Sequence, residues 1–298
     1  MSMKTPQQLH IPVLIDAVLT VLSPVKNESY LDLTAGYGGH ASAIIERTDA
    51  PQQATLVDRD QNAIRELSKS VAFANKARII HSDFLAAAKK LVDNGERYDM
   101  VLMDLGVSSP QLDRAERGFS FSSSAPLDMR MDESADQTAA EIVNRASEKE
   151  LAVIIERYGE ENVKRARKIA HAIRINRPIH TTTELAKIIE KVLHRDGKTH
   201  PATRTFQAIR IAVNDELRQL SETLPLVLEL LNPGGRLAII SFHSLEDRIV
   251  KEFLNEHAKA GYESDLELIT KKPITADSEE LVFNPRARSA KLRAAVKK

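Results

Sequence analysis

The stretch Tyr98–Asp113, YDMVLMDLGVSSPQLD, contains an apolar run, Met100–Met103, that ends on a carboxylate, Asp104. Glycine, serine and proline residues follow that carboxylate at once. A short apolar run of this kind is typical of a buried parallel strand, and the ligand sites of open α/β sheets lie in loops at the carboxyl ends of such strands. A carboxylate there is costly to bury unless it has a partner or a chemical task. We therefore expect Asp104 to lie opposite a ligand.

Strand-like and helix-like segments alternate through the first hundred residues. The apolar patterns predict strands over Ser29–Thr34, Ala54–Val57, Ala77–His81 and Met100–Met103, and helices over Ala41–Arg47, Gln61–Ser70 and Leu85–Val92. Strands separated by helices imply βαβ units and a parallel sheet. The first hundred residues therefore predict an α/β fold.

The alternation stops between Leu112 and about Thr199. A long loop, Arg114–Gln137, precedes helical patterns at Thr138–Arg157, Glu160–Ile175 and Thr182–His194. After another helical stretch, Ala202–Leu231, strand patterns return at Arg236–Ser241, Glu267–Thr270 and Ser289–Val296, the last two as a possible antiparallel pair. We expect a discontinuous domain of residues 1–112 and 202–298, interrupted by a lid loop and a helical domain at residues 113–201.

The composition excludes several classes of protein. Hydrophobic residues make up 42% of the chain and charged residues 28%, which is typical of a globular protein. Cysteine is absent, so disulfides and thiolate metal sites are excluded, and a cytoplasmic location is expected. No apolar run reaches the roughly 18–20 residues that span a bilayer, and the histidine spacing predicts no metal site. Since the net charge is zero, a surface that binds nucleic acid must be local.

A glycine-rich turn follows the first predicted strand. The segment Asp32–Ala41, DLTAGYGGHA, has glycines where the backbone could approach a ligand closely at the start of a helix. The same spacing fits the fingerprint of dinucleotide-binding proteins, so a nicotinamide oxidoreductase stays an alternative here. Asp32, four residues before Gly36, instead favours a cationic ligand group over a pyrophosphate.

Two later features suit any nucleoside-containing cofactor, and a third, taken in order with the acidic glycine turn and the acidic end of the second strand, favours S-adenosylmethionine over NAD. Asp58, 22 residues after Gly36, ends the second strand and could accept hydrogen bonds from both ribose hydroxyls. Phe84, in the segment Ser82–Phe84 after the third strand, could stack on an adenine. The turn Leu231–Gly235, LNPGG, is common in methyltransferases that use S-adenosylmethionine.

Eight sequence blocks go beyond the needs of a general fold. They are His10–Leu14, Gly36–His40, Asp104–Gln111, Glu116–Phe121, Pro126–Asp132, His200–Gln207, Ser241–Arg248 and Asn284–Arg288. With them the chain resembles, over nearly its whole length, the bacterial ribosomal RNA small subunit methyltransferase H family (MraW type). The glycine turn departs slightly from the family pattern at Ala35, Tyr37 and Ala41, and it keeps the required glycines.

The resemblance implies a Rossmann-like class I S-adenosylmethionine-dependent methyltransferase with an inserted all-helical domain. It implies methylation of the exocyclic N4 of a cytidine in the decoding region of 16S rRNA, within the small ribosomal subunit or a late precursor. The cofactor contacts that it implies are Gly38, Gly39, His40, Asp58, Phe84, Asp104 and Gln111. Other S-adenosylmethionine-dependent amino methylases, acting on DNA or free nucleotides, and a non-enzymatic RNA-binding protein remain the alternatives.

Asp104 is also the candidate catalytic residue, because a carboxylate beside the transfer site could accept the proton of N4. The sequence leaves open whether it does so or only holds the donor, while Ser108, His243 or water accepts the proton. RNA contacts are expected from the basic segment Val163–Arg177 and from stacking side chains of the loop Arg114–Gln137. A solvated helix face and structural packing are the corresponding alternatives.

Overall fold

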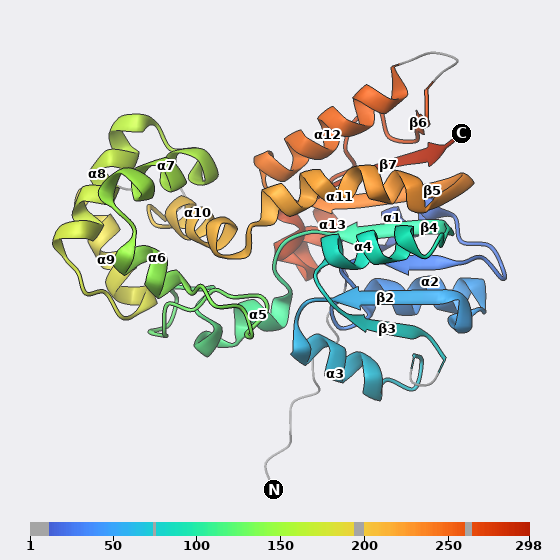
Figure 1. Ribbon diagram of the computed structural model, residues 1–298, viewed down its shortest axis with the longest axis horizontal. Coiled ribbons are helices and arrows are strands. Elements are labelled where there is room, and N and C mark those ends of the chain that lie inside the picture. Colours follow the sequence, from blue (N-terminus) through green and yellow to red (C-terminus); the bar gives the residue numbers. More distant parts are fainter. Residues whose placement is uncertain (1–11, 74–75, 194–199, 260–263) are drawn as a thin grey trace, which may run out of the picture. The chain divides into compact units, whose positions relative to one another are not determined.

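The computed structural model describes residues 12–73, 76–193, 200–259 and 264–298 (Figure 1). The chain divides into two compact units, a first unit of Met1–Gly106 with Gln219–Lys298 and a second unit of Val107–Arg218. The second unit extends beyond residues 113–201 at both ends. At its C-terminal end the reason is packing, since Phe206 and Ile209 share one hydrophobic core with Leu151 and Ile155.

The first unit contains a seven-stranded sheet with the strand order β3-β2-β1-β4-β5-β7-β6. Its strands are β1 Tyr30–Asp32, β2 Ala54–Asp58, β3 Arg78–His81, β4 Tyr98–Asp104, β5 Leu231–Ser241, β6 Leu266–Leu268 and β7 Lys291–Lys297. Strands β1 to β5 are parallel, and β7 runs antiparallel between β5 and β6. The predicted α/β class and the terminal antiparallel pair are both confirmed.

Helices cover both faces of this sheet. They are α1 Ile15–Leu22, α2 Gly39–Thr48, α3 Gln61–Lys69, α4 Phe84–Asp93, α11 Glu216–Leu230, α12 Ser244–Ala258 and α13 Ser278–Phe283, with 3₁₀ turns at Pro51–Gln53 and Pro285–Ser289. Helices α1 to α3 pack on one face and α4, α11 and α12 on the other (Figure 1).

The position of strand β4 in the sheet explains why its sequence is apolar without alternation. Met100 and Leu102 lie in the core on one face of the sheet, and Val101 and Met103 lie in the core on the other. A strand covered on both faces needs apolar residues at every position. The apolar run that predicted this strand therefore reflects its central place in the sheet, between β1 and β5.

The second unit is helical in its described residues. It holds α5 Ser109–Asp113, a 3₁₀ turn at Ala115–Arg117, α6 Ala139–Arg145, α7 Glu148–Gly159, α8 Val163–Ile175, α9 Thr182–Val192 and α10 Thr203–Asn214. The single helix expected over Thr138–Arg157 is two helices. The break follows from a capping box in which Glu150 N–H donates to Ser147 Oγ and Ser147 N–H donates to Glu150 Oε2. The stretch Ala202–Leu231 is likewise broken, at Asp215, whose φ is 52°.

The loop Arg114–Gln137 packs into the core of the second unit. Phe119, Met129 and Met131 are each at most 9% exposed and belong to that core, and Phe121 contacts the Phe206 ring at 4.7 Å. Asn214 holds the loop through hydrogen bonds with the Met129 carbonyl and the Met131 N–H. Phe119, Met129 and Met131 are therefore used in packing within the unit, as the structural alternative for this loop expects, and stacking of the loop on a base stays a prediction.

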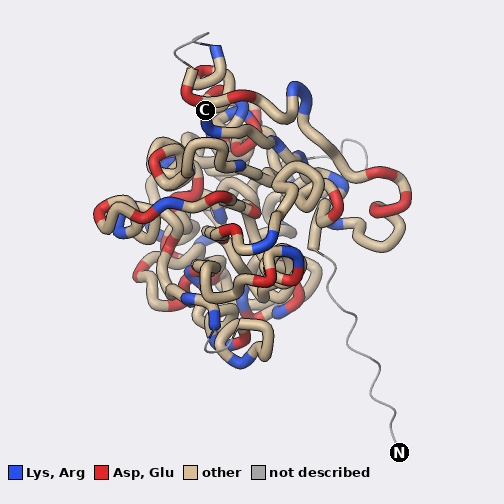
Figure 2. The backbone as a smooth tube through the Cα atoms, turned by 90° about the vertical axis from the view of Figure 1, so that its right-hand side faces the viewer, with Lys and Arg blue, Asp and Glu red and all other residues tan. Residues whose placement is uncertain are grey.

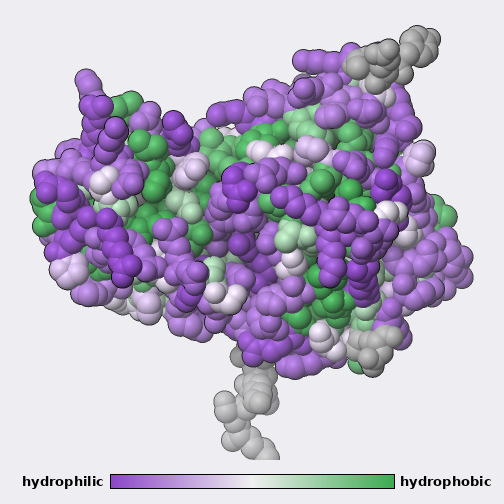
Figure 3. Space-filling view, in the orientation of Figure 1, coloured by the Kyte–Doolittle hydropathy of each residue, from purple (hydrophilic) through white to green (hydrophobic). Residues whose placement is uncertain are grey.

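The surface is mixed in character. Acidic and basic residues are interspersed along the backbone (Figure 2), in keeping with a net charge of zero. Hydrophilic residues cover most of the face seen in Figure 3, with smaller hydrophobic areas between them. Among the described helices, none combines the length and the hydropathy needed to cross a membrane.

Candidate active site at the carboxyl edge of the sheet

Three aspartates lie at the carboxyl ends of adjacent strands. Asp32 of β1 pairs in register with Leu56 of β2 and Leu102 of β4. Asp58 and Asp104 each lie two residues beyond those partners, so both project past the end of β1. The parallel sheet thus brings together two of the acidic residues that the sequence singled out.

The glycine turn is tied to Asp58. Gly36 N–H donates a hydrogen bond of 2.7 Å to Asp58 Oδ2, and Asp60 N–H donates one of 2.7 Å to Oδ1. Burial raises the pKa of Asp58 to about 6. Each carboxylate oxygen keeps a second lone pair, and the residue is partly exposed, so Asp58 can still accept hydrogen bonds from a ligand.

The turn itself requires glycine at two positions. Gly38 has a φ of +81°, and a Cβ there would lie 2.4 Å from Phe73 Cε2. A Cβ on Gly39 would lie 2.6 Å from Pro12 Cγ. Because Gly38 is the N-cap of α2 and offers no side-chain hydrogen bond, the first N–H groups of that helix have no side-chain cap. The turn can therefore present main-chain donors to a ligand.

Asp104 has an incomplete set of hydrogen bonds. Its N–H donates to Thr34 Oγ1 at 2.5 Å, which fixes the end of β4 against the chain after β1. Its Oδ1 is buried and has no hydrogen-bond partner among the described residues. Burial, followed by the negative charge of Glu246, raises the pKa of Asp104 to about 7. Asp104 thus holds an unused acceptor atom and can carry a proton near neutral pH.

His40, the second residue of α2, lies beside the Asp104 carboxyl group. Its Nδ1 lies 3.6 Å from Asp104 Oδ2, and its Nε2 lies 2.9 Å from the Val13 carbonyl oxygen. Since a carbonyl only accepts, Nε2 carries the hydrogen, and Nδ1 has its lone pair towards Asp104 when the ring is neutral. Burial lowers the pKa of His40, so the neutral ring is favoured. His40 and Asp104 can therefore hold one proton between them.

Asp32 stabilises the position of Asp104 through Thr34. Tyr30 Oη–H donates to Asp32 Oδ2 at 2.7 Å, Thr34 N–H donates to Oδ1 at 3.1 Å, and Asp32 is only 1% exposed. Burial raises the pKa of Asp32 to about 6. The sequence had favoured a ligand contact for Asp32. Instead its carboxylate is enclosed and orients Thr34, which in turn holds Asp104.

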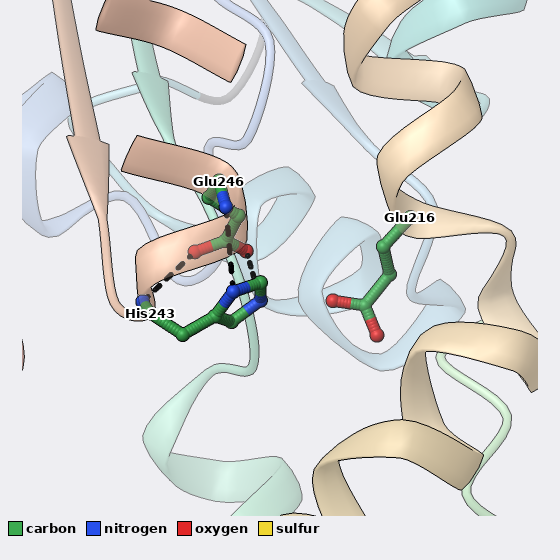
Figure 4. A group of neighbouring side chains, drawn as sticks. All are labelled: Glu216, His243 and Glu246. Carbon is green, nitrogen blue, oxygen red and sulfur yellow. Dashed lines mark hydrogen bonds and ion pairs between the residues drawn. The ribbon is translucent and has the colours of Figure 1, made fainter. Parts of the chain in front are cut away.

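Glu246 is a residue of this edge that the sequence analysis missed. It lies at the start of α12, 2% exposed, and its Oε2 accepts a hydrogen bond from Phe242 N–H at 2.8 Å. The same oxygen accepts a second hydrogen bond, from His243 N–H at 3.3 Å (Figure 4). Glu246 N–H donates to His243 Nδ1 at 3.3 Å. The spacing of an N-cap residue and an acid three residues later is the signal that could have found this cap. In the described structure His243 caps α12, and its contact with a nucleotide stays a prediction.

Two further predicted cofactor residues belong to different units. Phe84 is partly buried at the start of α4, directly after Asp83, whose Oδ1 accepts from Ala86 N–H at 2.8 Å. Gln111 belongs to the second unit, where it is 5% exposed and its Oε1 accepts from Ser108 N–H at 3.0 Å. The first unit alone therefore assembles Gly38, Gly39, His40, Asp58, Phe84 and Asp104 along one edge of its sheet.

Comparison with known proteins gives the chain a family. The MraW methylase family matches residues 7–298. The chain is 49% identical to the ribosomal RNA small subunit methyltransferase H of a Cyanothece species, covering 97% of this chain and 95% of that protein, and 45% identical to the protein of the same name from Heliobacterium mobile, covering 97% and 98%. A solved rRNA methylase from Streptococcus thermophilus is 10% identical, with a TM-score of 0.43 over 100% of this chain and 99% of that one. The chain belongs to the MraW methylase family.

Proposed function

We propose that this protein transfers the methyl group of S-adenosylmethionine to the exocyclic N4 of a cytidine in the decoding region of 16S rRNA. The substrate is the RNA within the small ribosomal subunit or a late precursor. The observation that carries the proposal is the buried Asp104 Oδ1 without a hydrogen-bond partner among the described residues, at the ligand edge of the sheet. Family membership and relatives named ribosomal RNA small subunit methyltransferase H support the substrate.

The charges at the edge fit S-adenosylmethionine better than NAD. Asp58, Asp104 and Glu246 contribute carboxyl groups there. Burial lowers the pKa of His40, the imidazole that pairs with Asp104, which favours its neutral form. S-adenosylmethionine brings a sulfonium and an ammonium group, which an acidic edge attracts. The pyrophosphate of NAD would be repelled by the same carboxylates. This choice of cofactor accords with the methylase family.

Each residue at the edge is assigned to a different part of the cofactor. We assign the ribose hydroxyls to the remaining lone pairs of Asp58 and the adenine to Phe84. The uncapped N–H groups at Gly39 and His40 suit the carboxylate of the amino-acid part, since a helix N-terminus attracts anions. Gly38 keeps the turn close, and Asp104 lies beside the reacting end. Gln111 stays a proposed contact from the second unit.

The chemical problem is the weak nucleophilicity of the cytosine amine, whose lone pair is delocalised into the ring. When bound, S-adenosylmethionine supplies an electrophilic methyl carbon. The protein must align N4 with that carbon and accept the proton that N4 loses. Asp104 Oδ1 has the free acceptor lone pairs, and its pKa of about 7 suits a base near neutral pH. His40 Nδ1, on the other side of the carboxyl group, can share the proton afterwards.

The test uses small ribosomal subunits from cells that lack this enzyme and S-adenosylmethionine with a deuterated methyl group. We expect deuterated N4-methylcytidine at one position of 16S rRNA, mapped by mass spectrometry of RNA fragments. Transfer to DNA or to free cytidine nucleotides with equal efficiency would support the alternative amino methylases instead. Calorimetry that detected binding of NAD and none of S-adenosylmethionine would overturn the proposal at its first step.

A further inference from the structure

The exposed face of α8 carries unpaired positive charge. Lys164, Arg167 and Lys168 are exposed, and none of them has a hydrogen bond or an ion pair with another described residue. Their spacing of three and four residues places them on one side of the helix, within one turn of each other. No acidic residue occurs between Asn162 and Arg177. These three side chains therefore form a compact cationic face, referred to below as the α8 face.

The other cations of this segment are neutralised or used structurally. Arg165 Nε lies 3.4 Å from Glu161 Oε2, and Arg174 Nε lies 2.6 Å from Glu148 Oε2. Arg177 donates to the carbonyl oxygens of Val143 at 2.8 Å and of Ala146 at 2.5 Å. The acidic residues next to α8 are thus paired with its flanks and not with the α8 face.

The position of the α8 face within the helix argues against a purely solvating role. Lys164, Arg167 and Lys168 lie in the first half of a helix that starts at Val163, and its first turn contains no acidic residue. The N-terminal end of a helix carries partial positive charge, so Lys164, in the first turn, is unfavourably placed, while Arg167 and Lys168 lie in the second turn, where this effect has fallen off. Solubility alone would favour acids there and cations in the last turn. A cation at such a place lowers the local stability of the helix, and sequences break local rules of this kind mainly where function requires the residue.

We propose that the α8 face binds the phosphate backbone of the RNA substrate. The inference rests on the proposed function, which supplies an RNA partner, and it names the residues that hold the sugar-phosphate chain. Each of the three cations can neutralise one phosphate and release its counterions. The partial positive charge at the start of α8 adds to the attraction. Contacts of this kind fix position on the RNA and carry no base specificity.

The test compares the full-length wild type with the triple variant K164Q/R167Q/K168Q. Glutamine keeps the length and the helix propensity of the replaced residues. The readout is the affinity for a 16S rRNA fragment, measured by fluorescence anisotropy from 50 to 300 mM KCl. We expect the slope of log K against log[KCl] to become shallower by about 2 to 3, and the affinity at 0.1 M salt to fall by about 10²-fold.

A matched control separates these three positions from charge in general. K90Q/K251Q/K271Q removes the same charge from three exposed lysines of the first unit and should leave the salt slope near that of the wild type. The α8 variant should melt close to the wild type, since all three side chains are exposed, glutamine keeps a similar helix propensity, and only Lys164 lies in the first turn, where a cation is unfavourable.

The outcomes of this experiment distinguish a failure of the α8 face from a failure of the proposed function. If the wild type methylates RNA and the α8 variant keeps the wild-type slope, the α8 face is not a phosphate site, while the proposed function stands. If the α8 variant and the control lose the same affinity, only net charge matters and the inference fails. If the wild type binds S-adenosylmethionine but no RNA, the proposed function and this inference fall together. A methylation assay of the α8 variant should show a raised KM for RNA with kcat nearly unchanged.

Discussion

His40 Nδ1 lies 3.6 Å from Asp104 Oδ2, while the hydrogen on the opposite ring nitrogen of His40 is held by the Val13 carbonyl. One side of the Asp104 carboxyl group therefore faces a lone pair, and the other side, Oδ1, has no hydrogen-bond partner among the described residues. A carboxyl group placed in this way can take a proton on one oxygen and share it through the other.

Asp104→Asn should remove the proton acceptor and keep the size of the side chain. We expect kcat for methylation at saturating cofactor and RNA to fall by about 10²–10⁴-fold, the usual contribution of a general base. Single-turnover rates with preformed enzyme–RNA complex measure this directly. Asp93→Asn, an exposed change at the end of α4, is the matched control and should keep the wild-type rate. A variant at Asp104 with near-native turnover would leave this residue only a contact of the cofactor.

The rate should depend on the protonation of Asp104. A base must be deprotonated to act, and the pKa of Asp104 is raised to about 7 by burial and by Glu246. We therefore expect kcat/KM to rise about tenfold per pH unit below pH 7 and to level off above it. A bound sulfonium favours the carboxylate, so the inflection of kcat should lie at lower pH than that of kcat/KM. Flat profiles from pH 5.5 to 8.5 would contradict a titrating base.

Glu246→Gln should shift this inflection. The negative charge of Glu246 contributes to the raised pKa of Asp104, so its removal lowers that pKa. The amide oxygen of glutamine can still accept from Phe242 N–H, which preserves the start of α12. We expect the inflection of kcat/KM to move to lower pH with the plateau rate retained. Loss of the plateau with no shift would mean that Glu246 acts only through the structure of the cap.

The strands and the acidic edge could be predicted from the sequence because they depend on local patterns. A central parallel strand has an apolar run, and Asp58 and Asp104 end such runs. The break at Ser147 could not be predicted from periodicity, since a two-residue cap outweighs the continuing helical pattern. The burial of Met129 and Met131 depends on tertiary packing with distant helices, which no local pattern encodes. The closeness of Glu246 to Asp104 likewise depends on the sheet order.

Stability without cofactor should fall as the pH rises from 5 to 8. Burial raises the pKa of Asp32 and Asp58 to about 6 and that of Asp104 to about 7, so the folded state binds protons more tightly than the unfolded state. The stabilisation is complete below about pH 4 and is lost as the pH rises through 6 to 7. The lowered pKa of His40 acts in the opposite direction up to about pH 6.5, so this one group reduces the trend set by the three aspartates without reversing it. The lowered pKa values of Asp99 and Asp247 act in the opposite direction only below about pH 4. The melting temperature at constant ionic strength measures this trend.

Binding of S-adenosylmethionine should weaken that dependence. A cation beside these carboxyl groups stabilises their charged forms, so the cofactor displaces protons and binds more tightly as the pH rises from 5 to 8. Calorimetry in two buffers with different ionisation enthalpies should detect proton release near pH 6.5. The variant Asp104→Asn should release less. An affinity that does not change with pH would contradict a cationic ligand at this edge.

Gly38→Ala should disrupt the glycine turn for two reasons that can be separated. The left-handed φ of +81° costs a residue with a Cβ about 1–3 kcal/mol, and the new Cβ would lie 2.4 Å from Phe73 Cε2. Gly95 has a φ of +71° and open space around its Cβ position, so Gly95→Ala carries the backbone strain alone. Urea unfolding should therefore show a loss for Gly38→Ala that exceeds the loss for Gly95→Ala by about 1–3 kcal/mol, the usual cost of overpacking. Replacing the ring by a smaller side chain in Gly38→Ala/Phe73→Leu should recover part of the excess.

The same two single variants should differ in cofactor binding. Because the turn carries the N–H groups of α2, only Gly38→Ala should weaken S-adenosylmethionine binding. Equal losses of stability and unchanged cofactor affinity in both single variants would show that Phe73 yields and that the turn tolerates a side chain.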